Sequence, residues 1–246
     1  LLIGNGYIGY RGTLEEFGKE QKTATIASGL YDRVGDQWRE PVNLPNGCFI
    51  QVIYHGEPLH ALTSKIVSHF QGLDMYSATH TRETTFESSD GNCITIRSRR
   101  FASMARHHLI CMEYTIRADH ECEVDIRTGI DGDVWDINGP HLKAMELSEE
   151  DGIISVRAVT HENKIPLTVA EAISISCAGQ PQALVHEKLS IMREICGVKL
   201  RDDLTIYKYV AHATGLEESN PHQASRDLCK GAASLGFDML LDEHRR

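Results

Sequence analysis

Short segments rich in β-branched residues, with apolar and polar side chains in alternation, follow one another between residues 22 and 210 of this 246-residue chain. Alternation with a period of two is typical of half-buried strands. Ten or more such segments, with no amphipathic helix between them, exclude an alternating α/β layout and exceed a minimal seven-stranded sandwich. The pattern predicts an all-β fold, a large two-sheet antiparallel sandwich, with strands at 23–27, 48–54, 84–87, 93–97, 108–117, 122–128, 142–147, 153–160, 165–177, 183–191 and 204–212.

Turn residues indicate which strands pair with each other. Asp90-Gly91 and Asp151-Gly152 each lie between two predicted strands. Because Asp-Gly suits a tight turn with positive φ, both sites predict a β-hairpin. The strands at 108–117 and 122–128 are predicted to form a further pair across the four residues between them.

The pattern changes near Gly215, and residues 216–246 are predicted to be helical. Asn220 is a suitable helix cap, and Pro221 suits the first turn. Apolar residues then recur at helical spacing, although Gly231 and Gly236 weaken a single continuous helix. We therefore divide the chain into a β domain, residues 1–215, and a helical segment, residues 216–246, whose apolar stripe consists of Ala224, Leu228, Ala232, Leu235, Met239 and Leu240.

Three glycines near the start of the chain, Gly4, Gly6 and Gly9, match the spacing of a dinucleotide-binding loop. That loop requires a strand before it, a helix opening at its last glycine and a surrounding βαβ unit. Gly12 is a poor residue for such a helix, and turn residues occupy the region where a regular second strand is needed. We reject a nucleotide site, expect no cofactor, and interpret the glycines as points of close backbone packing.

Composition narrows the range of partners. A net charge of −10 argues against nucleic acid and anionic membranes, because a basic surface is missing. No apolar run is long enough to span a bilayer. An odd number of widely spaced cysteines, without a C-x-x-C motif, predicts reduced thiols and a cytoplasmic protein; the seven are Cys48, Cys93, Cys111, Cys122, Cys177, Cys196 and Cys229.

Carboxylates and a tryptophan gather in one strand-end segment. Asp131, Asp133 and Trp135 could bind a sugar, because an indole stacks on a pyranose ring while acids accept hydrogen bonds from its hydroxyls. The more frequent explanation is a turn with one buried tryptophan. A calcium site is excluded, since the later ligands of a calcium-binding loop are missing. The 13 histidines show no metal-binding spacing, so we expect no metal.

Two further groups of charges have simple explanations. Glu15 and Glu16 lie in a turn-like context, where solvation accounts for them. The basic stretch at 97–101 could bind a phosphate or an acidic partner, but paired exposed arginines are the simpler interpretation, since Arg97 and Arg99 share one face of a strand. No nucleophile motif appears, and we assign no catalytic residue.

A set of short strings resembles the N-terminal domain of glycoside hydrolase family 65, the maltose, trehalose and kojibiose phosphorylases and their relatives. The resemblance covers essentially the whole chain, and its strings occur in the order in which the family has them. One departure is Gly47, which stands where the family often has tryptophan. The strings are GNGYIGYRG at residues 4–12, GLYD at 29–32, LPN at 44–46, RFASM at 100–104 and GIDGDV at 129–134.

The resemblance implies a super-sandwich similar to galactose mutarotase-like domains, followed by linker helices and an (α/α)6 catalytic barrel. The family's reaction is phosphorolysis of an α-glucoside with inversion: a carboxylic acid protonates the leaving oxygen while phosphate attacks the opposite face of the sugar. The acid and the phosphate-binding loop belong to the barrel. The implied partners are therefore that barrel, a disaccharide, inorganic phosphate and a second subunit in a homodimer.

Three other functions stay open at this point. A carbohydrate-binding module needs an exposed aromatic platform, for which Trp38 and Trp135 are a small supply. A stand-alone sugar epimerase of the mutarotase type needs a histidine and a glutamate that face each other across a cleft. A parent enzyme that hydrolyses its α-glucoside, rather than phosphorolysing it, is the third.

Overall fold

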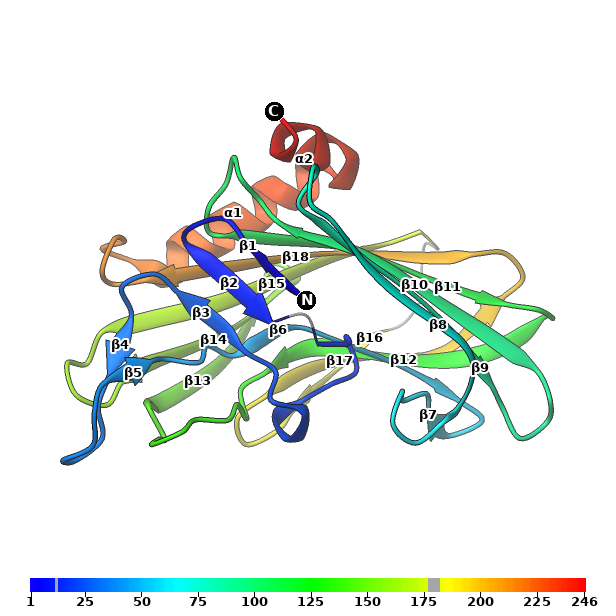
Figure 1. Ribbon diagram of the computed structural model, residues 1–246, viewed down its shortest axis with the longest axis horizontal. Coiled ribbons are helices and arrows are strands. Elements are labelled where there is room, and N and C mark those ends of the chain that lie inside the picture. Colours follow the sequence, from blue (N-terminus) through cyan, green and yellow to red (C-terminus); the bar gives the residue numbers. More distant parts are fainter. Residues whose placement is uncertain (12, 177–181) are drawn as a thin grey trace.

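The computed structural model of the protein describes residues 1–11, 13–176 and 182–246. Two large antiparallel sheets lie face to face, and helices cover the outer face of the larger sheet (Figure 1). The predicted all-β sandwich with a helical C-terminal segment is confirmed. Gly12, Cys177 and the end of the strand predicted at 165–177 lie outside the described residues.

Within the described residues, the larger sheet contains β8 (Lys65–Asp74), β9 (Thr79–Glu87), β10 (Cys93–Ala102), β11 (Leu109–Ala118), β13 (Leu142–Glu150), β14 (Ile153–Thr160), β15 (Pro166–Ile175) and β18 (Leu204–Thr214). Their order is β13-β14-β15-β18-β11-β10-β9-β8. The smaller sheet contains β6 (Asn46–Tyr54), β7 (Glu57–Pro58), β12 (Cys122–Asp131), β16 (Gln182–His186) and β17 (Ile191–Leu200). Its order is β16-β17-β12-β6-β7.

Two minor sheets and a short 3₁₀ helix come from the first part of the chain. They are β1 (Leu2–Gly4), β2 (Ile8–Arg11) and β3 (Thr25–Ala27), then β4 (Tyr31–Asp32) with β5 (Glu40–Pro41), and η1 (Lys19–Gln21). β1 and β2 form an antiparallel hairpin, in which Gly6 has a φ of 87°. A glycine-bearing hairpin is not the strand–helix turn that a dinucleotide-binding loop requires.

The central strands of the larger sheet are buried on both faces because their side chains alternate between the core shared with the smaller sheet and the core under the helices. Along β11, Met112 and Tyr114 face the smaller sheet, where they pack with Ile126 of β12. Cys111 points the other way and belongs to the cluster that the helices cover, together with Phe237. The two cores together hold the sheets and the helices in fixed relative positions.

The C-terminal segment forms two helices among the described residues, α1 (Pro221–Leu235) and α2 (Phe237–His244). Asn220 caps α1 as predicted, since its side-chain oxygen accepts a hydrogen bond from Gln223 N at 3.2 Å. Gly236, with a φ of 81°, separates the helices. The predicted apolar stripe is wrong in part: Leu235 and Met239 are exposed, and the buried residues of α1 are Pro221, Ser225, Cys229 and Ala232.

The two predicted hairpins are confirmed, with Cys93 opposite Glu87 and Ile153 opposite Glu150. The predicted pair 108–117 and 122–128 is wrong, because β11 lies in the larger sheet and β12 in the smaller one. Both strands alternate well, but alternation identifies a buried face and not the partner strand. The residues between them carry the chain from one sheet to the other.

The strand predicted at 183–191 is also wrong, because β16 ends at His186 and β17 begins at Ile191. Most of β17 was missed, since Gly197, with a φ of 68°, interrupts its pattern. The edge strand β8 was missed because its exposed residues show no clear alternation.

The described cysteines form no disulfide, and Cys48, Cys111 and Cys229 are buried. Among the described residues, no helix has both the length and the apolar character needed to cross a bilayer.

Candidate functional site

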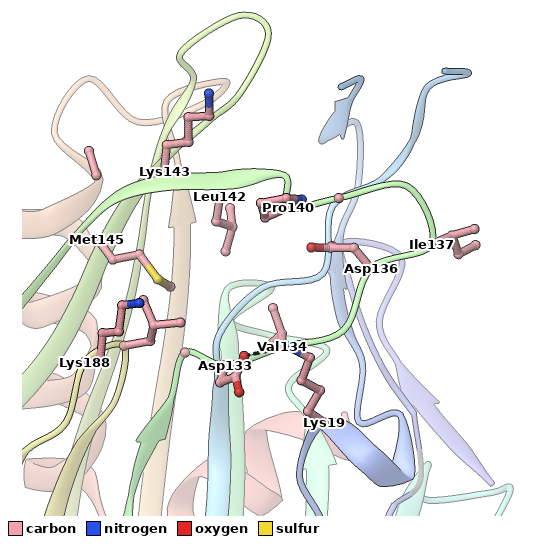
Figure 2. A pocket seen from close by; sticks show the side chains of 14 residues that line it. Lys19, Asp133, Val134, Asp136, Ile137, Pro140, Leu142, Lys143, Met145 and Lys188 are labelled. Carbon is pink, nitrogen blue, oxygen red and sulfur yellow. Dashed lines mark hydrogen bonds and ion pairs between the residues drawn. The ribbon is translucent and has the colours of Figure 1, made fainter. Parts of the chain in front are cut away.

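An open cleft of 660 Å³ lies beside the segment that joins β12 to β13. Its walls come from residues 132–145, from Lys188 and Leu189 before β17, and from Lys19 of η1 (Figure 2). Both flanking strands are irregular there: the register of β12 shifts between Gly129 and Asp131, and that of β13 shifts between Lys143 and Glu146. Bulges of this kind redirect side chains next to functional sites.

Asp131 braces the floor of this region and does not line the cleft. Its Oδ1 accepts hydrogen bonds from Ser190 Oγ at 2.8 Å and from Asp133 N at 3.0 Å. Burial raises the pKa of the Asp131 carboxyl, because little water is left to solvate the charged form. The side chain therefore connects the end of β12 to the loop before β17.

Asp133 lines the cleft and is exposed. Lys19 Nζ donates a hydrogen bond to Asp133 Oδ1 at 2.8 Å, and this bond raises the pKa of the lysine. Because the pair is solvated, it contributes at most about 1 kcal/mol to stability, and either side chain is free to turn toward a ligand.

Trp135 is half-buried and is absent from the cleft wall. Its Nε1 donates a hydrogen bond to Thr23 O at 2.9 Å, and Asn43 Nδ2 donates to Trp135 O at 3.1 Å. These bonds fasten the strand-end turn to the start of β3. The structure thus places Trp135 in the turn that we considered the more frequent explanation.

Asp136 lines the cleft, although sequence analysis did not select it. Figure 2 shows its carboxylate directed into the cleft, while Ile137 points away. Burial raises the pKa of Asp136, and its one described hydrogen bond, from His141 N, is long at 3.4 Å. Functional residues are often carboxylates of this kind, which lie at a cleft, have a raised pKa and form few hydrogen bonds. Its place in the same Asp-rich string was the available signal.

His141 lies fully buried behind Asp136, between two acids. Its Nδ1 is 3.0 Å from Asp32 Oδ2, and its Nε2 is 2.7 Å from Glu40 Oε1. Burial opposes protonation, but the hydrogen bonds to Glu40 and Asp32 outweigh it and raise the pKa of the imidazole. Protonation of the ring neutralises part of the buried acid charge, which is why these acids favour it.

Glu40, Asp136 and His141 also bring three ligand atoms within 4.8 Å of one another, a spacing that suits a metal ion. The hydrogen bonds explain the cluster without one. Glu40 Oε1 already accepts bonds from Ile137 N and Asn138 N, both at 3.0 Å, as well as from His141. We therefore interpret these residues as a clamp that holds the turn bearing Asp136.

The acids at residues 15 and 16 are not solvated, which corrects the sequence-based interpretation. Arg82 Nη1 lies 2.7 Å from Glu15 Oε2 and 2.5 Å from Glu16 Oε2, and Arg100 Nη1 lies 2.8 Å from Glu15 Oε1. All four side chains are essentially inaccessible to solvent. Arg100 was missed as a buried residue because a single sequence does not show which arginine of a basic stretch points inward.

This buried network also argues against the hypothesis that the chain is a sugar epimerase. Burial alone would raise the pKa of Glu15, but Arg100 and Arg82 lower it to about 2. The fully buried His80 lies on the same face of the larger sheet, and burial followed by Arg100 lowers its pKa to about 4. A carboxylate fixed by two guanidinium groups has no access to a sugar proton, so this Glu–His pair offers no working acid–base couple.

Comparison with known proteins gives the family. The model of the glycosyl hydrolase family 65 N-terminal domain matches residues 1–246. Nigerose phosphorylase of Lachnoclostridium phytofermentans is 32% identical over 99% of this chain and 35% of its own length. The 1,2-alpha-glucosylglycerol phosphorylase of Bacillus selenitireducens is 33% identical over 71% of this chain and 23% of its own.

A solved structure agrees with this assignment at the level of the fold. A human-microbiome protein provisionally named a kojibiose phosphorylase superposes with a TM-score of 0.86 at 16% identity, over 99% of this chain and 34% of its own. The chain thus spans about a third or less of the length of these relatives. The resemblance found in the sequence is confirmed: the chain belongs to glycosyl hydrolase family 65 and constitutes its N-terminal domain.

Proposed function

We propose that the chain is the non-catalytic domain of an inverting phosphorylase, which uses phosphate to cleave an α-glucoside and release glucose 1-phosphate. One observation carries the proposal. The chain matches the N-terminal domain of the family along its whole length, and its named relatives are phosphorylases about three times as long. Phosphate is already an anionic nucleophile, so the reaction needs one general acid, supplied by a barrel in the same polypeptide.

The described acids support a scaffolding role. Glu15, Glu16 and Glu171 are buried and paired with Arg82, Arg100 or Lys208. Asp136 is the one cleft acid with a raised pKa, and the other acid of the described cleft wall, Asp133, is paired with Lys19. This arrangement of the described acids supports a non-catalytic role for the domain.

An exposed apolar surface around α2 is a suitable place for the barrel to pack. Three segments meet there at His244: Met104 N donates to His244 Nδ1 at 3.1 Å, and His244 Nε2 donates to Ser77 O at 2.8 Å. The neighbouring Met75 and Tyr76 are 83% and 101% exposed, and Met239 of α2 is 55% exposed. We define Met75, Tyr76, Met104 and Met239 as the α2 patch. Its large exposed side chains favour association with another apolar surface.

The proposal is tested by activity assays on two proteins. The 246-residue chain, incubated with inorganic phosphate and kojibiose, nigerose, maltose or trehalose, should release no glucose 1-phosphate. The product of the extended reading frame should release it from at least one of these sugars. Turnover by the short chain would refute the non-catalytic role, and release of free glucose alone by the long one would indicate a hydrolase.

Carbohydrate binding at the 660 Å³ cleft is a second candidate function, favoured by the exposed Asp133 and by Asp136. Asp131 and Trp135 would then act as supports for the cleft wall. Calorimetric titration with a disaccharide should show binding that Asp133→Ala weakens and Asp36→Ala, a change in the exposed loop between β4 and β5, does not. Equal affinities of the two variants would argue against this site.

The remaining assignments follow from the same proposal. Residues 1–215 form the β domain and 216–246 the linker to the barrel, in a cytoplasmic homodimer without a cofactor. Mass measurement by light scattering on the full-length protein tests the dimer, and a monomer at micromolar concentration would contradict it.

A further inference from the structure

A second pocket, of 500 Å³, lies between the N-terminal segment and the edge strand β8, away from the residues of the first cleft. This volume falls within the range of about 300–1,000 Å³ that is usual for small-molecule sites. Phe17 and Gln21 line one wall, and Leu62, His69 and Gln71 line the other. We call it the β8 pocket.

The polar groups of the β8 pocket form one directional chain of hydrogen bonds. His80 Nε2 lies 3.2 Å from Gln71 Oε1, Gln71 Nε2 lies 3.1 Å from His69 Nε2, and His69 Nδ1 lies 2.8 Å from Thr84 Oγ1. Because an amide oxygen only accepts, His80 Nε2 donates, and Gln71 then donates to His69. One N–H of the Gln71 amide therefore remains available for a ligand.

The chain of hydrogen bonds carries no net charge. Burial and the nearby Arg82 lower the pKa of His69, and burial followed by Arg100 lowers that of His80 to about 4. Both rings are neutral at pH 7. Gln21 is likewise an uncharged wall residue whose Oε1 accepts from Gly18 N at 3.1 Å, so its NH₂ group is also available.

A rigid base holds these groups in place. Thr84 Oγ1 accepts a hydrogen bond from Arg82 Nε at 2.8 Å, and Arg82 is fixed by the buried Glu15 and Glu16. Pre-organised polar groups bind with a smaller entropy loss than mobile ones. Apolar side chains complete the pocket, namely Phe17, whose ring centroid lies 5.2 Å from that of His60, and the 65% exposed Leu62.

We infer that the β8 pocket binds a neutral sugar. The free N–H groups of Gln71 and Gln21 match the hydroxyl oxygens of a pyranose, while Phe17 and Leu62 offer an apolar surface to its C–H face. The absence of an acid from the wall of this described pocket argues against a cationic ligand. The inference goes beyond the proposed function, because it needs neither a barrel nor a phosphorolytic activity.

The test is a titration of the ¹⁵N-labelled chain with glucose and with kojibiose, followed by NMR. Binding should shift the amide signals of residues 14–21 and 62–71. Gln71→Ala should weaken binding about tenfold through the loss of one hydrogen bond. Leu62→Trp, which fills the pocket from an exposed position, should abolish it without affecting the fold. Gln37→Ala, an exposed change outside the pocket, and Asp133→Ala, in the 660 Å³ cleft, are the matched controls.

Each other outcome has a defined meaning. Shifts confined to residues 132–145 and sensitive to Asp133→Ala would place the sugar in the first cleft and overturn the inference. Absence of shifts with either sugar would overturn it as well, whatever the phosphorolysis assays show. Binding of inorganic phosphate that depends on Arg11, at the pocket edge, and competes with glucose would show an anion site instead.

Discussion

Arg82 is fully buried and reaches two carboxylates, so at the scale of single residues it dominates the electrostatics of the interior. A buried ion pair is often no more stabilising than an apolar replacement of both partners, but loss of one partner leaves an unpaired charge in a low dielectric. The depressed pKa of Glu15 shows the same dependence from the side of the acid.

We expect Arg82→Met to reduce the free energy of unfolding by about 3–5 kcal/mol, because Glu15 and Glu16 lose their shared cation. Urea denaturation at pH 7 measures the change. Arg97→Met is the matched control: Arg97 pairs with Glu83 at the surface, and the loss should stay below about 1 kcal/mol. Similar losses for the two variants would contradict the role given to burial.

The buried His212 leads to a prediction about how the stability of the fold depends on pH. His212 is fully buried, neither ring nitrogen has a partner among the described residues, and burial lowers its pKa to about 3, although the neighbouring backbone of His108 opposes part of the shift. The unfolded chain takes up a proton near pH 6.5, but the folded chain does not, so stability falls as pH decreases from 6.5 toward 3. The protonation of this one residue in the unfolded chain should lower the free energy of unfolding by about 2 kcal/mol at pH 5.

His212→Leu should remove that part of the acid sensitivity and leave stability at pH 8 unchanged or higher, since no hydrogen bond to the ring is lost. Unfolding free energies measured from pH 8 to pH 5 give the slope. His107→Leu, at an exposed position, should keep the wild-type slope. A wild-type slope in the His212 variant would show that the ring is hydrated or paired.

Sequence analysis at this scale succeeded where a residue acts locally. Asn220 was recognised as a cap because its partner, Gln223 N, is three residues away. It failed for Glu15 and Glu16, whose partner Arg82 lies more than sixty positions along the chain and approaches them only when β9 faces the N-terminal segment. Asp136 was missed for a related reason, since Glu40, which holds its turn, comes from β5, almost a hundred positions earlier in the chain.

At the scale of elements, local signals identified strands and turns better than partners. The Asp-Gly hairpins were predicted correctly because the turn itself defines the pairing. β11 and β12 are also separated by only a short segment of the chain, as the strands of the two hairpins are, yet they belong to different sheets. The difference arises from which apolar face each strand buries, and this is decided by the packing of the whole sandwich.

Gly47 of β6 shows how closely the two sheets approach. A Cβ atom there would overlap the Val210 side chain of β18 and lie 3.2 Å from Val169 Cγ1 of β15. Gly47→Ala should therefore cost about 1–3 kcal/mol through overpacking. The tryptophan that the family often has at this position requires a different set of neighbours.

A double-mutant cycle with Val210→Ala tests this explanation, because the smaller side chain should recover part of the loss. Gly231→Ala in α1 is the control: its added Cβ meets nothing within 4 Å, and the helix should gain about 1 kcal/mol. Strict additivity of the two substitutions at 47 and 210 would refute the contact.

At the scale of the whole molecule, the family resemblance predicted more of the architecture than any physical pattern in the sequence did. Strings such as RFASM identified the architecture, whereas composition and alternation led only to a large sandwich. Neither source revealed the α2 patch, because it depends on three segments that meet at His244. Figure 1 shows that α2 and the tip of the β8–β9 hairpin lie at the same edge of the molecule.

The proposed packing of the barrel on the α2 patch predicts a difference between short and long proteins. Met239→Lys changes a 55% exposed side chain, so it should alter the unfolding free energy of the 246-residue chain by less than about 0.5 kcal/mol. In the polypeptide that includes the barrel, the same lysine would be buried without a partner, and the thermal midpoint should fall by several degrees. Trp38→Lys is the control, because Trp38 belongs to the segment between β4 and β5. These two strands lie far from α2 (Figure 1), so the change should affect neither protein. Equal midpoints for the long wild-type and Met239→Lys proteins would place the barrel on another surface, since an unpaired ammonium group cannot enter an apolar interface without cost.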